Sequence, residues 1–393
     1  MSKHKYLTRT VLILSFISLF ADIASEMLYP VMPFYLKSIG FTALSIGVLE
    51  GFAQFVIGIS TGYFGNLSDR LGKRVLFIRA GYFLSAISKT MMALFIYPWW
   101  VFFSRFTDRL GKGLRTGARD AILSAESHDE HKGKVFGFHR AMDTTGAAIG
   151  PVIALVYLYY HPDDYRTLFF IALGPGLFSV AITFLIREKK FITAKAKAAS
   201  ANFFSFFSYW NRASPDYKKI LIGLLGFSLF NSSDAFLFLA AKNEGMEDNY
   251  IIGAYIFYNL VYAGFAFPAG SLADKLGMKK TFSIGLALFA IVYAGMSINT
   301  SQLSLYILFF VYGLFAAFTE GVSTAWISKH CSREERGTAM GLYKSSSSIC
   351  LLLSSTIVGF LWMHFSPFVA LSSSAVGAVC VIIYFFAGAR KIA

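Results

Sequence analysis

The sequence predicts an all-α membrane protein, with twelve transmembrane helices in two pseudo-symmetric six-helix bundles. Three observations support this prediction: an apolar composition, twelve successive hydrophobic runs and an internal repeat. The chain has 393 residues, 56% of them apolar and 15% charged, with a mean hydropathy of +0.57. Soluble domains carry about 25% charged residues, so this chain has too little polar surface to be one.

The hydrophobic runs match the thickness of a bilayer, which about 20 consecutive apolar residues span as a helix. The first run is longer than a signal-peptide core and lacks a convincing cleavage site, so we expect it to remain as the first helix. The runs fall at 8–33, 43–64, 75–96, 98–122, 135–160, 166–186, 219–241, 250–272, 279–298, 303–327, 338–362 and 366–387.

A polar segment separates the sixth run from the seventh. We expect an N-terminal bundle at 1–186, a cytoplasmic linker at 187–218 and a C-terminal bundle at 219–393. The linker begins with several lysines and continues with the string FFSFFSYW at 203–210. Basic residues followed by aromatic ones predict an interfacial segment on an anionic leaflet. A flexible tether with incidental aromatic residues is the alternative.

The net charge of +14 is distributed in a way that indicates membrane orientation rather than nucleic-acid binding. Lysine and arginine concentrate in alternate loops, whereas the loops between them hold only Lys37, Arg166 and Lys242. Cytoplasmic loops carry the excess of positive charge, and twelve crossings return the chain to its starting side. Both termini are therefore expected in the cytoplasm, with membrane lipids as partners and no nucleic acid.

An internal repeat relates the two halves. The string GNLSDRLGKR at 65–74 recurs as GSLADKLGMKK at 270–280, and GKVFGFHR at 133–140 recurs in pattern as GTAMGLYK at 337–344. These shifts of 205 and 204 residues, together with SLF at 18–20 and 228–230, indicate a duplicated six-helix unit. Two such halves, related by an axis along the membrane normal, predict a substrate site between them near mid-membrane.

The repeated string resembles the signature loop of the major facilitator superfamily, and the resemblance covers essentially the whole chain. Two further strings, DIASEMLYP at 22–30 and RFTDRLGKGLRTGARDA at 105–121, look like a bacterial subgroup of that superfamily. The resemblance implies a secondary transporter of the bacterial inner membrane that works by alternating access and is driven by an ion gradient. Its partners would be a small-molecule substrate and protons or another coupling ion, and we expect a monomer.

The repeated string is also a candidate gate. Its glycines permit tight turns and close helix approach, and Asp69 and Asp274 can accept hydrogen bonds at the start of a neighbouring helix. The resemblance implies that the aspartate pairs with Arg115 or Arg119 near the cytoplasmic end of the fourth helix. A turn that only sets topology is the alternative. The candidate gating residues are Gly65, Asp69, Arg70, Gly72, Lys73, Arg74, Arg115, Arg119, Gly270, Asp274 and Gly277.

Charged residues inside the hydrophobic runs mark a candidate pathway. A charge at the bilayer centre costs about 2.5–3.5 kcal/mol on the insertion scale, so such residues must line water or pair with one another. Lys89 is one such charge, although it is not among the pathway candidates. The candidates are Asp22, Glu26, Glu50, Arg105, Asp108, Arg109, Lys112, Arg140, Asp143, Asp234 and Glu320.

The run at 98–122 is unusually basic. At about 100° per residue, five basic residues share one helix face within an arc of roughly 120°, and Asp108 lies inside that arc. Such a stripe favours a pathway for an anion, such as a carboxylate-bearing metabolite or a metal chelator. A structural charge network is the alternative. The five residues are Arg105, Arg109, Lys112, Arg115 and Arg119.

Asp22 and Glu26 lie one helical turn apart on the same face of the first run. Repulsion between them and partial burial favour proton uptake by one of the two, whereas nearby arginines oppose it. We therefore expect Asp22 or Glu26 to carry the coupling proton. Asp234 and Glu320 are the corresponding candidates in the second half.

The string DTTGAAIGPVIA at 143–154 resembles a superfamily motif associated with proton antiporters, although Ile153 and Ala154 stand where that motif has two glycines. Small residues at this spacing also let helices pack closely. The leading hypothesis is a proton-coupled transporter of a small organic solute, and the basic stripe favours an anion. The alternative is a proton-driven efflux pump for amphiphilic compounds, or an exporter or importer of siderophores.

An enzyme is not expected. The sequence has no HExxH string and no clustered histidine and cysteine ligands, so we expect no catalytic residue, metal or cofactor. Cys331, Cys350 and Cys380 lack metal-ligand spacing and are expected to pack between helices. A membrane-embedded enzyme, a lipid-handling protein or a sensor on the same scaffold is the alternative from another class.

Overall fold

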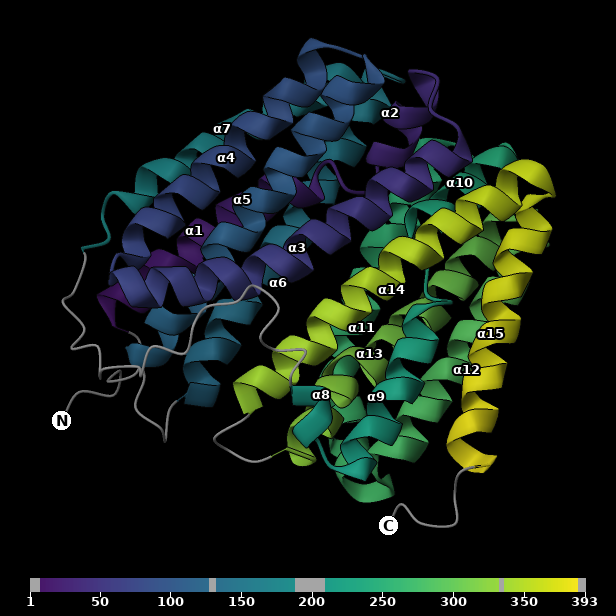
Figure 1. The fold of residues 1–393 in the computed structure, drawn as a ribbon. Helices are drawn as coiled ribbons and strands as arrows, with labels where there is room; N and C mark the ends of the chain where they lie inside the picture. Colours follow the sequence, from purple (N-terminus) through teal and green to yellow (C-terminus); the bar gives the residue numbers. More distant parts are fainter. Residues whose placement is uncertain (1–7, 127–131, 188–208, 332–335, 388–393) are drawn as a thin grey trace. The chain divides into compact units, whose positions relative to one another are not determined.

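The computed structural model describes residues 8–126, 132–187, 209–331 and 336–387, and the regular structure within them is helical (Figure 1). The elements are α1 (Arg9–Glu26), α2 (Met32–Ser38), α3 (Ala43–Leu71), α4 (Arg74–Leu94), α5 (Pro98–Ala125), α6 (Lys132–Tyr160), α7 (Tyr165–Thr183), α8 (Tyr209–Arg212), α9 (Pro215–Ser228), α10 (Ala235–Asn243), α11 (Asp248–Leu276), α12 (Met278–Met296), α13 (Gln302–Lys329), α14 (Arg336–His364) and α15 (Pro367–Ala387).

Both halves of the chain begin with a broken helix. The run at 8–33 forms α1 and α2, because Pro30 has no amide proton for a helical hydrogen bond. The run at 219–241 forms α9 and α10, and polar side chains supply the hydrogen bonds at that break. The amide of Ser233 donates to Ser355 Oγ at 3.1 Å, and Ser233 Oγ accepts from the amide of Ala235 at 3.3 Å. The prediction of one continuous helix for each of these runs is therefore wrong.

The repeated strings are helix ends rather than loops. Helix α3 continues to Leu71 and α11 to Leu276, so the turn to the next helix falls at a glycine in each copy. Gly72 has φ +63° and Gly277 has φ +89°. Both angles lie in the left-handed region, which glycine adopts without the steric penalty of a Cβ atom. A glycine at this point in both copies is therefore explained by the backbone of the turn.

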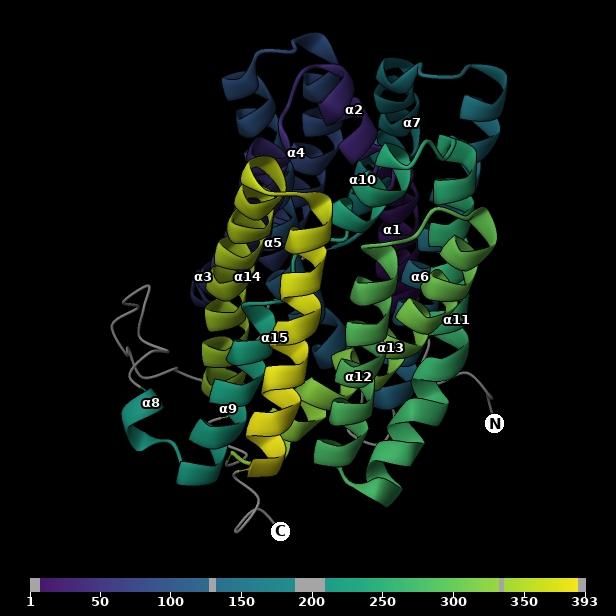
Figure 2. The same cartoon turned by 90° about the vertical axis from the view of Figure 1, so that its right-hand side faces the viewer.

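The chain divides into two compact units, one of Met1–Tyr35 with Val56–Ala201 and the other of Leu36–Phe55 with Asn202–Ala393. In the first unit α4 packs on α5 and α7, and α1 packs on α6 and α7. In the second unit α12 packs on α13 and α15, and α9 packs on α14 and α15 (Figure 2). The same pairs of helices meet in both units, as expected for a duplicated six-helix unit.

The first part of α3 groups with the second unit because it packs closely on α14. A Cβ atom added to Gly359 of α14 would lie 2.7 Å from the backbone oxygen of Ala43. The boundaries at 1–186, 187–218 and 219–393 stay a prediction. Residues 188–208, with most of the FFSFFSYW string, lie outside the described part of the chain.

Eight of the described helices are long and apolar enough to cross a membrane by themselves. They are α3, α6, α7 and α11 to α15. Helix α5 has 28 residues, but its charged residues lower its mean hydropathy. Its charges must therefore be accommodated inside the protein.

Both units have a buried hydrophobic core, and aromatic rings are prominent in that of the second. In the first unit, aliphatic residues such as Val11, Leu14 and Ile78 are fully buried. In the second unit, aromatic rings pack on one another: the ring centroids of Phe289 and Tyr293 are 4.0 Å apart, and both residues are fully buried. Aromatic residues in the second unit therefore fill its interior as well as its outer surface.

Candidate functional site

Helices α4 and α5 approach each other closely through small residues. A Cβ atom added to Gly111 of α5 would lie 2.6 Å from the backbone oxygen of Gly81 and 2.9 Å from the amide nitrogen of Ser85. Ser85 Oγ donates to the backbone oxygen of Asp108 at 3.1 Å. This close approach places Lys89 of α4 beside Asp108 of α5.

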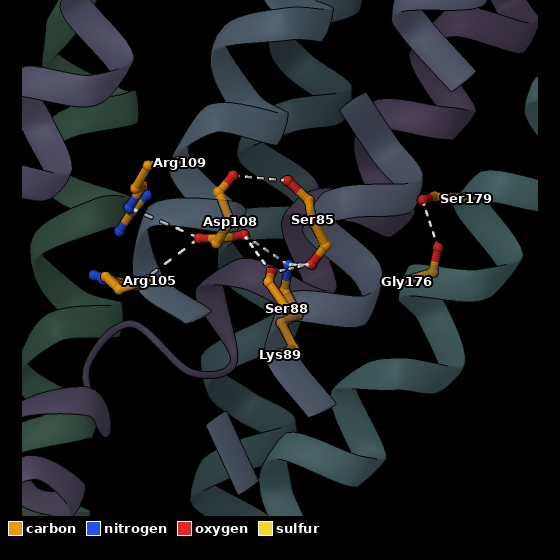
Figure 3. A network of polar contacts seen from close by, with 8 residues as sticks. All are labelled: Ser85, Ser88, Lys89, Arg105, Asp108, Arg109, Gly176 and Ser179. Carbon is orange, nitrogen blue, oxygen red and sulfur yellow. Dashed lines mark hydrogen bonds and ion pairs between the residues drawn. The ribbon is translucent and has the colours of Figure 1, made fainter. Parts of the chain in front are cut away.

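Asp108 is shared by three cations (Figure 3). Its carboxylate lies 3.4 Å from Lys89 Nζ, 3.9 Å from an Nη atom of Arg105 and 3.7 Å from Arg109 Nε. The three basic side chains are at most 9% exposed. These four residues, the Asp108 cluster, carry two excess positive charges where water screens little.

A cavity of about 30 Å³ lies beside the Asp108 cluster. Helix α1 and the turn after it contribute Glu26 and Tyr29 to the lining of this cavity, and α5 contributes Lys112. A cavity of this volume holds about one water molecule. The predicted pathway residues that line this cavity are Glu26, Arg105, Asp108, Arg109 and Lys112.

Asp22 lies against α6 and is not among the residues that line this cavity. A Cβ atom added to Gly146 of α6 would lie 3.0 Å from Asp22 Cβ. A Cβ atom added to Gly150 would lie 2.6 Å from the backbone oxygen of Ile23. The two glycines of the string at 143–154 therefore let α1 and α6 pack closely, which is one of the two roles expected for them.

The other acidic candidate of this region, Asp143, lies near a buried histidine. His139 Nε2 is 3.7 Å from Asp143 Oδ1, and His139 Nδ1 is 3.3 Å from Ser15 Oγ. His139 is 4% exposed, whereas Arg140 beside it is exposed.

The last two residues of the basic stripe are separate from the Asp108 cluster. The guanidinium carbon of Arg115 lies 4.2 Å from the centroid of the Tyr82 ring. Arg119 Nε lies 3.0 Å from Asp120 Oδ1, and its Nη1 donates to Ser18 Oγ at 3.2 Å. The stripe is therefore divided between a cavity and contacts nearer the end of α5.

In the candidate gate, the structure describes the side chain of the aspartate in the second copy, Asp274, but not that of Asp69 in the first. Asp274 Oδ1 lies 3.5 Å from Lys329 Nζ at the end of α13, and both side chains are exposed. The side chains of Asp69 and Arg70 in the first copy lie outside the described part, so their pairing with Arg115 or Arg119 stays a prediction.

The glycines of the gate differ in their surroundings. A Cβ atom added to Gly117 of α5 would lie 2.7 Å from Gly65 Cα, so α3 and α5 approach closely there. Gly270 has open space at the corresponding position. Lys73 is exposed at the turn after Gly72, and Arg74 is half-buried at the start of α4.

The acidic candidates of the second half lie in the second unit. Asp234, at the break before α10, and Glu320 of α13 both line a cavity of about 220 Å³. Tyr312 donates its hydroxyl to Asp234, and Tyr262 donates to Glu320 Oε2 at 2.8 Å. Glu50 is buried in the part of α3 that belongs to this unit.

Several polar residues of these sites are not among the sequence candidates. Lys89 could have been included, because it is a charge inside a hydrophobic run. His139 and the tyrosines carry no such signal, since the sequence contains 21 tyrosines. Only the packing of α13 against α11 and against the break before α10 shows which tyrosines meet Asp234 and Glu320.

Two features bear on enzyme chemistry. The string GISTG at 58–62 has the spacing of a serine nucleophile elbow, which requires a sharp strand-to-helix turn. It lies inside α3, where Ser60 donates its hydroxyl to the backbone oxygen of Val56. Among the described residues, no three histidine, cysteine or acidic side chains are grouped closely enough to hold a metal ion.

Comparison with known proteins gives one family. The model of the Major Facilitator Superfamily matches residues 14–258 and 245–392. An uncharacterized MFS-type transporter, MJ1317 of Methanocaldococcus jannaschii, is 34% identical over 364 residues, which are 91% of this chain and 89% of that protein. The multidrug resistance protein MdtH of an Enterobacter species is 28% identical over 165 residues, 41% of this chain and 40% of that protein.

Solved structures show the same fold at low sequence identity. The nucleoside transporter NupG has a TM-score of 0.77 at 15% identity, covering 98% of this chain and 100% of that one. A bacterial homologue of the lysosomal transporter Spinster has a TM-score of 0.77 at 14% identity, covering 99% of this chain and 98% of that one.

Proposed function

The chain belongs to the Major Facilitator Superfamily and is a multi-pass membrane transporter, and we propose that it moves a small organic anion in exchange for, or together with, protons. The proposal places it in the bacterial inner membrane with both termini in the cytoplasm. The observation that carries the proposal is the Asp108 cluster, in which three buried cations share one carboxylate.

The excess positive charge of this cluster favours an anion. Burying an ion costs several kcal/mol unless an opposite charge compensates it, and Asp108 can balance only one of the three cations that surround it. Lys112 and Glu26 line the same cavity and add one charge of each sign. A carboxylate or phosphate at this cavity would therefore add negative charge beside the buried cations.

The geometry of the basic groups also suits such a ligand. Arginine presents a planar fork of donors that binds two oxygens of a carboxylate or phosphate at once. Arg105 and Arg109 are one helical turn apart and both line the cavity. At about 30 Å³, the cavity has no room for an organic solute, so we propose that it widens during alternating access.

Proton coupling is proposed to use Asp22 or Glu26. Glu26 shares its cavity with Arg109 and Lys112, so a proton taken up by Glu26 would increase the positive charge available to an anion. Asp22 lies in the interface of α1 with α6, near the string that includes Asp143. The two positions thus correspond to two different routes for the proton.

Ligand-dependent thermal stability of the purified full chain tests the anion proposal. The library contains carboxylates, organophosphates and siderophores, each measured against its neutral amide or ester where one exists. We expect an anion to raise the melting temperature of the wild-type protein, and Arg109→Ala to abolish that shift. Lys280→Ala, at an exposed position of α12, is the matched control and should keep the shift. Equal shifts in Arg109→Ala and the wild type would overturn the proposal.

The alternative is proton-driven efflux of amphiphilic compounds. The partial match to the multidrug resistance protein MdtH and the aromatic interior of the second unit favour it. Accumulation of a lipophilic fluorescent cation in inside-out vesicles with an acidic interior, from which protons flow outward, distinguishes the two. Efflux predicts accumulation of the cation that stops when the gradient is dissipated, whereas the anion proposal predicts none.

A further inference from the structure

The cavity of the second unit differs from the first in size and in charge. Its volume of about 220 Å³ lies just below the range of about 300–1,000 Å³ for drug-sized ligands. It is therefore large enough for a small organic group. The residues that line it come from α9, the break before α10, α11, α12, α13 and α14.

Two carboxylates face this cavity, and none of the described residues that line it is basic. Tyr312 donates to Asp234, and Tyr262 donates to Glu320, so each carboxylate is held by a tyrosine hydroxyl. The sign of the charge is opposite to that of the Asp108 cluster. A cation is thus the ligand that this charge selects.

The walls of the cavity are aromatic. The rings of Tyr258 and Tyr312 are stacked with centroids 5.0 Å apart, and Tyr312 stacks on Phe315 at 5.3 Å. Phe227 meets the Phe315 ring edge to face at 5.9 Å. The face of an aromatic ring attracts a cation, and aromatic residues that line a cavity can recognise ammonium groups in this way.

A calcium or magnesium ion does not suit this set of side chains. Calcium takes six to eight oxygen ligands and magnesium requires six in an octahedron. Among the described residues, no grouping of three acidic, histidine or cysteine side chains could supply such ligands. Rings and two carboxylates instead match a group that is positive, apolar on its surface and wider than a metal ion.

We propose that this cavity binds a small organic ammonium ion, with its charge balanced by Asp234 and Glu320 and its methylene or methyl groups against Tyr258, Tyr312 and Phe315. The inference goes beyond the proposed function, because every residue that it uses belongs to the second unit and none belongs to the Asp108 cluster. The anion proposal and the ammonium proposal can therefore fail separately.

Binding of choline to the purified full chain tests the inference. The matched ligand is the uncharged alcohol in which a carbon atom replaces the quaternary nitrogen, because its shape is the same and only the charge differs. Titration calorimetry and thermal stability should both show binding of choline. The uncharged alcohol should bind about tenfold more weakly or not at all.

Variants locate the site. Asp234→Asn should weaken choline binding about tenfold, and Tyr258→Leu about fivefold, through loss of the charge and of one ring. Asp248→Asn is the matched control, because Asp248 pairs with Lys242 and does not line the cavity. If Asp234→Asn fails to fold, Glu320→Gln is measured instead, because Glu320 is exposed and its substitution should disturb the fold less. Equal binding of the two ligands, no binding of choline by the wild type, or full binding by the folded cavity variants would overturn the inference.

Discussion

Replacing Asp108 by asparagine removes the negative charge that Lys89, Arg105 and Arg109 share, while the size of the side chain is kept. Two unit charges 4 Å apart attract each other by about 4 kcal/mol at an effective dielectric constant of about 20. The three cations are 3.4–3.9 Å from the carboxylate. Most of this attraction offsets the desolvation of the four ions.

The variant leaves three buried cations without the carboxylate that they share. Loss of one partner from a buried ion pair costs about 3–5 kcal/mol of the free energy of unfolding. One kcal/mol lowers the melting temperature of a domain of about 150–250 residues by about 2–4 °C. We therefore expect Asp108→Asn to melt about 6–20 °C below the wild type.

Thermal unfolding of the purified protein, followed by tryptophan fluorescence, measures this change. Asp274→Asn is the matched control, because it removes the same group from an exposed ion pair. Exposed pairs contribute up to about 1 kcal/mol, so its melting temperature should fall by no more than about 4 °C. The double variant Asp108→Asn with Lys89→Met restores the original excess of two positive charges and should be more stable than Asp108→Asn alone.

Two results would refute this reasoning. Asp108→Asn could melt within the range of Asp274→Asn, which would show that the cluster is not electrostatically coupled. Alternatively, the loss of unfolding free energy in the double variant could equal the sum of the losses in Asp108→Asn and Lys89→Met. That result would show that Lys89 stabilises the fold independently of Asp108.

Three further predictions concern the first unit. Asp22→Asn and Glu26→Gln should be compared in proteoliposomes: the variant that lacks the coupling carboxyl should lose gradient-driven uptake and keep exchange, and unchanged uptake in both would contradict the proposal. Gly150 and Gly174 both precede a proline inside a helix, so valine at either position carries the same backbone penalty. Gly150→Val should be about 1–3 kcal/mol less stable than Gly174→Val, because its Cβ would lie 2.6 Å from the oxygen of Ile23, whereas Gly174 has open space there. Asp164→Ala should cost about 1 kcal/mol, because Asp164 caps α7 by accepting from the amide of Thr167 at 3.3 Å. A hydrogen bond from Tyr157 at 2.6 Å lowers the pKa of Asp164. The contribution of this cap is therefore complete at neutral pH and is lost as the pH falls below about 4. The melting temperatures of wild type and Asp164→Ala should converge in acid, and a constant difference would contradict this.

The internal repeat predicted the arrangement of helices better than the positions of their ends. Two strings recur in the second half after shifts of 205 and 204 residues, which predicts that each half contains the same helices. In the structure, corresponding pairs of helices meet in both units. The positions of helix ends were less predictable. Residues 65–71 carry several polar side chains and suggest a loop, yet they continue α3. Their helical conformation depends on packing, such as that of Gly65 against Gly117.

The sequence also could not predict the contacts of the charged residues. Helical periodicity alone places Arg105, Arg109, Lys112, Arg115 and Arg119 on one face of α5. It contains no information on the helices opposite that face. Tyr82 of α4 meets Arg115, whereas Lys89, about two turns further along α4, meets Asp108. The basic stripe of α5 thus contributes residues both to the Asp108 cluster and to the contact with the Tyr82 ring.

By itself, the sequence determined the membrane class, the duplicated six-helix unit and the family. These depend on hydrophobic length, periodicity and repeated strings, which are local properties of the chain. Only the tertiary structure decided which charges share a cavity, that three cations share Asp108, and that Asp234 and Glu320 face stacked aromatic rings. The physical reason is that compensation of a buried charge depends on distances between helices, which helical periodicity does not contain, and close packing at residues such as Gly81 and Gly111 sets those distances.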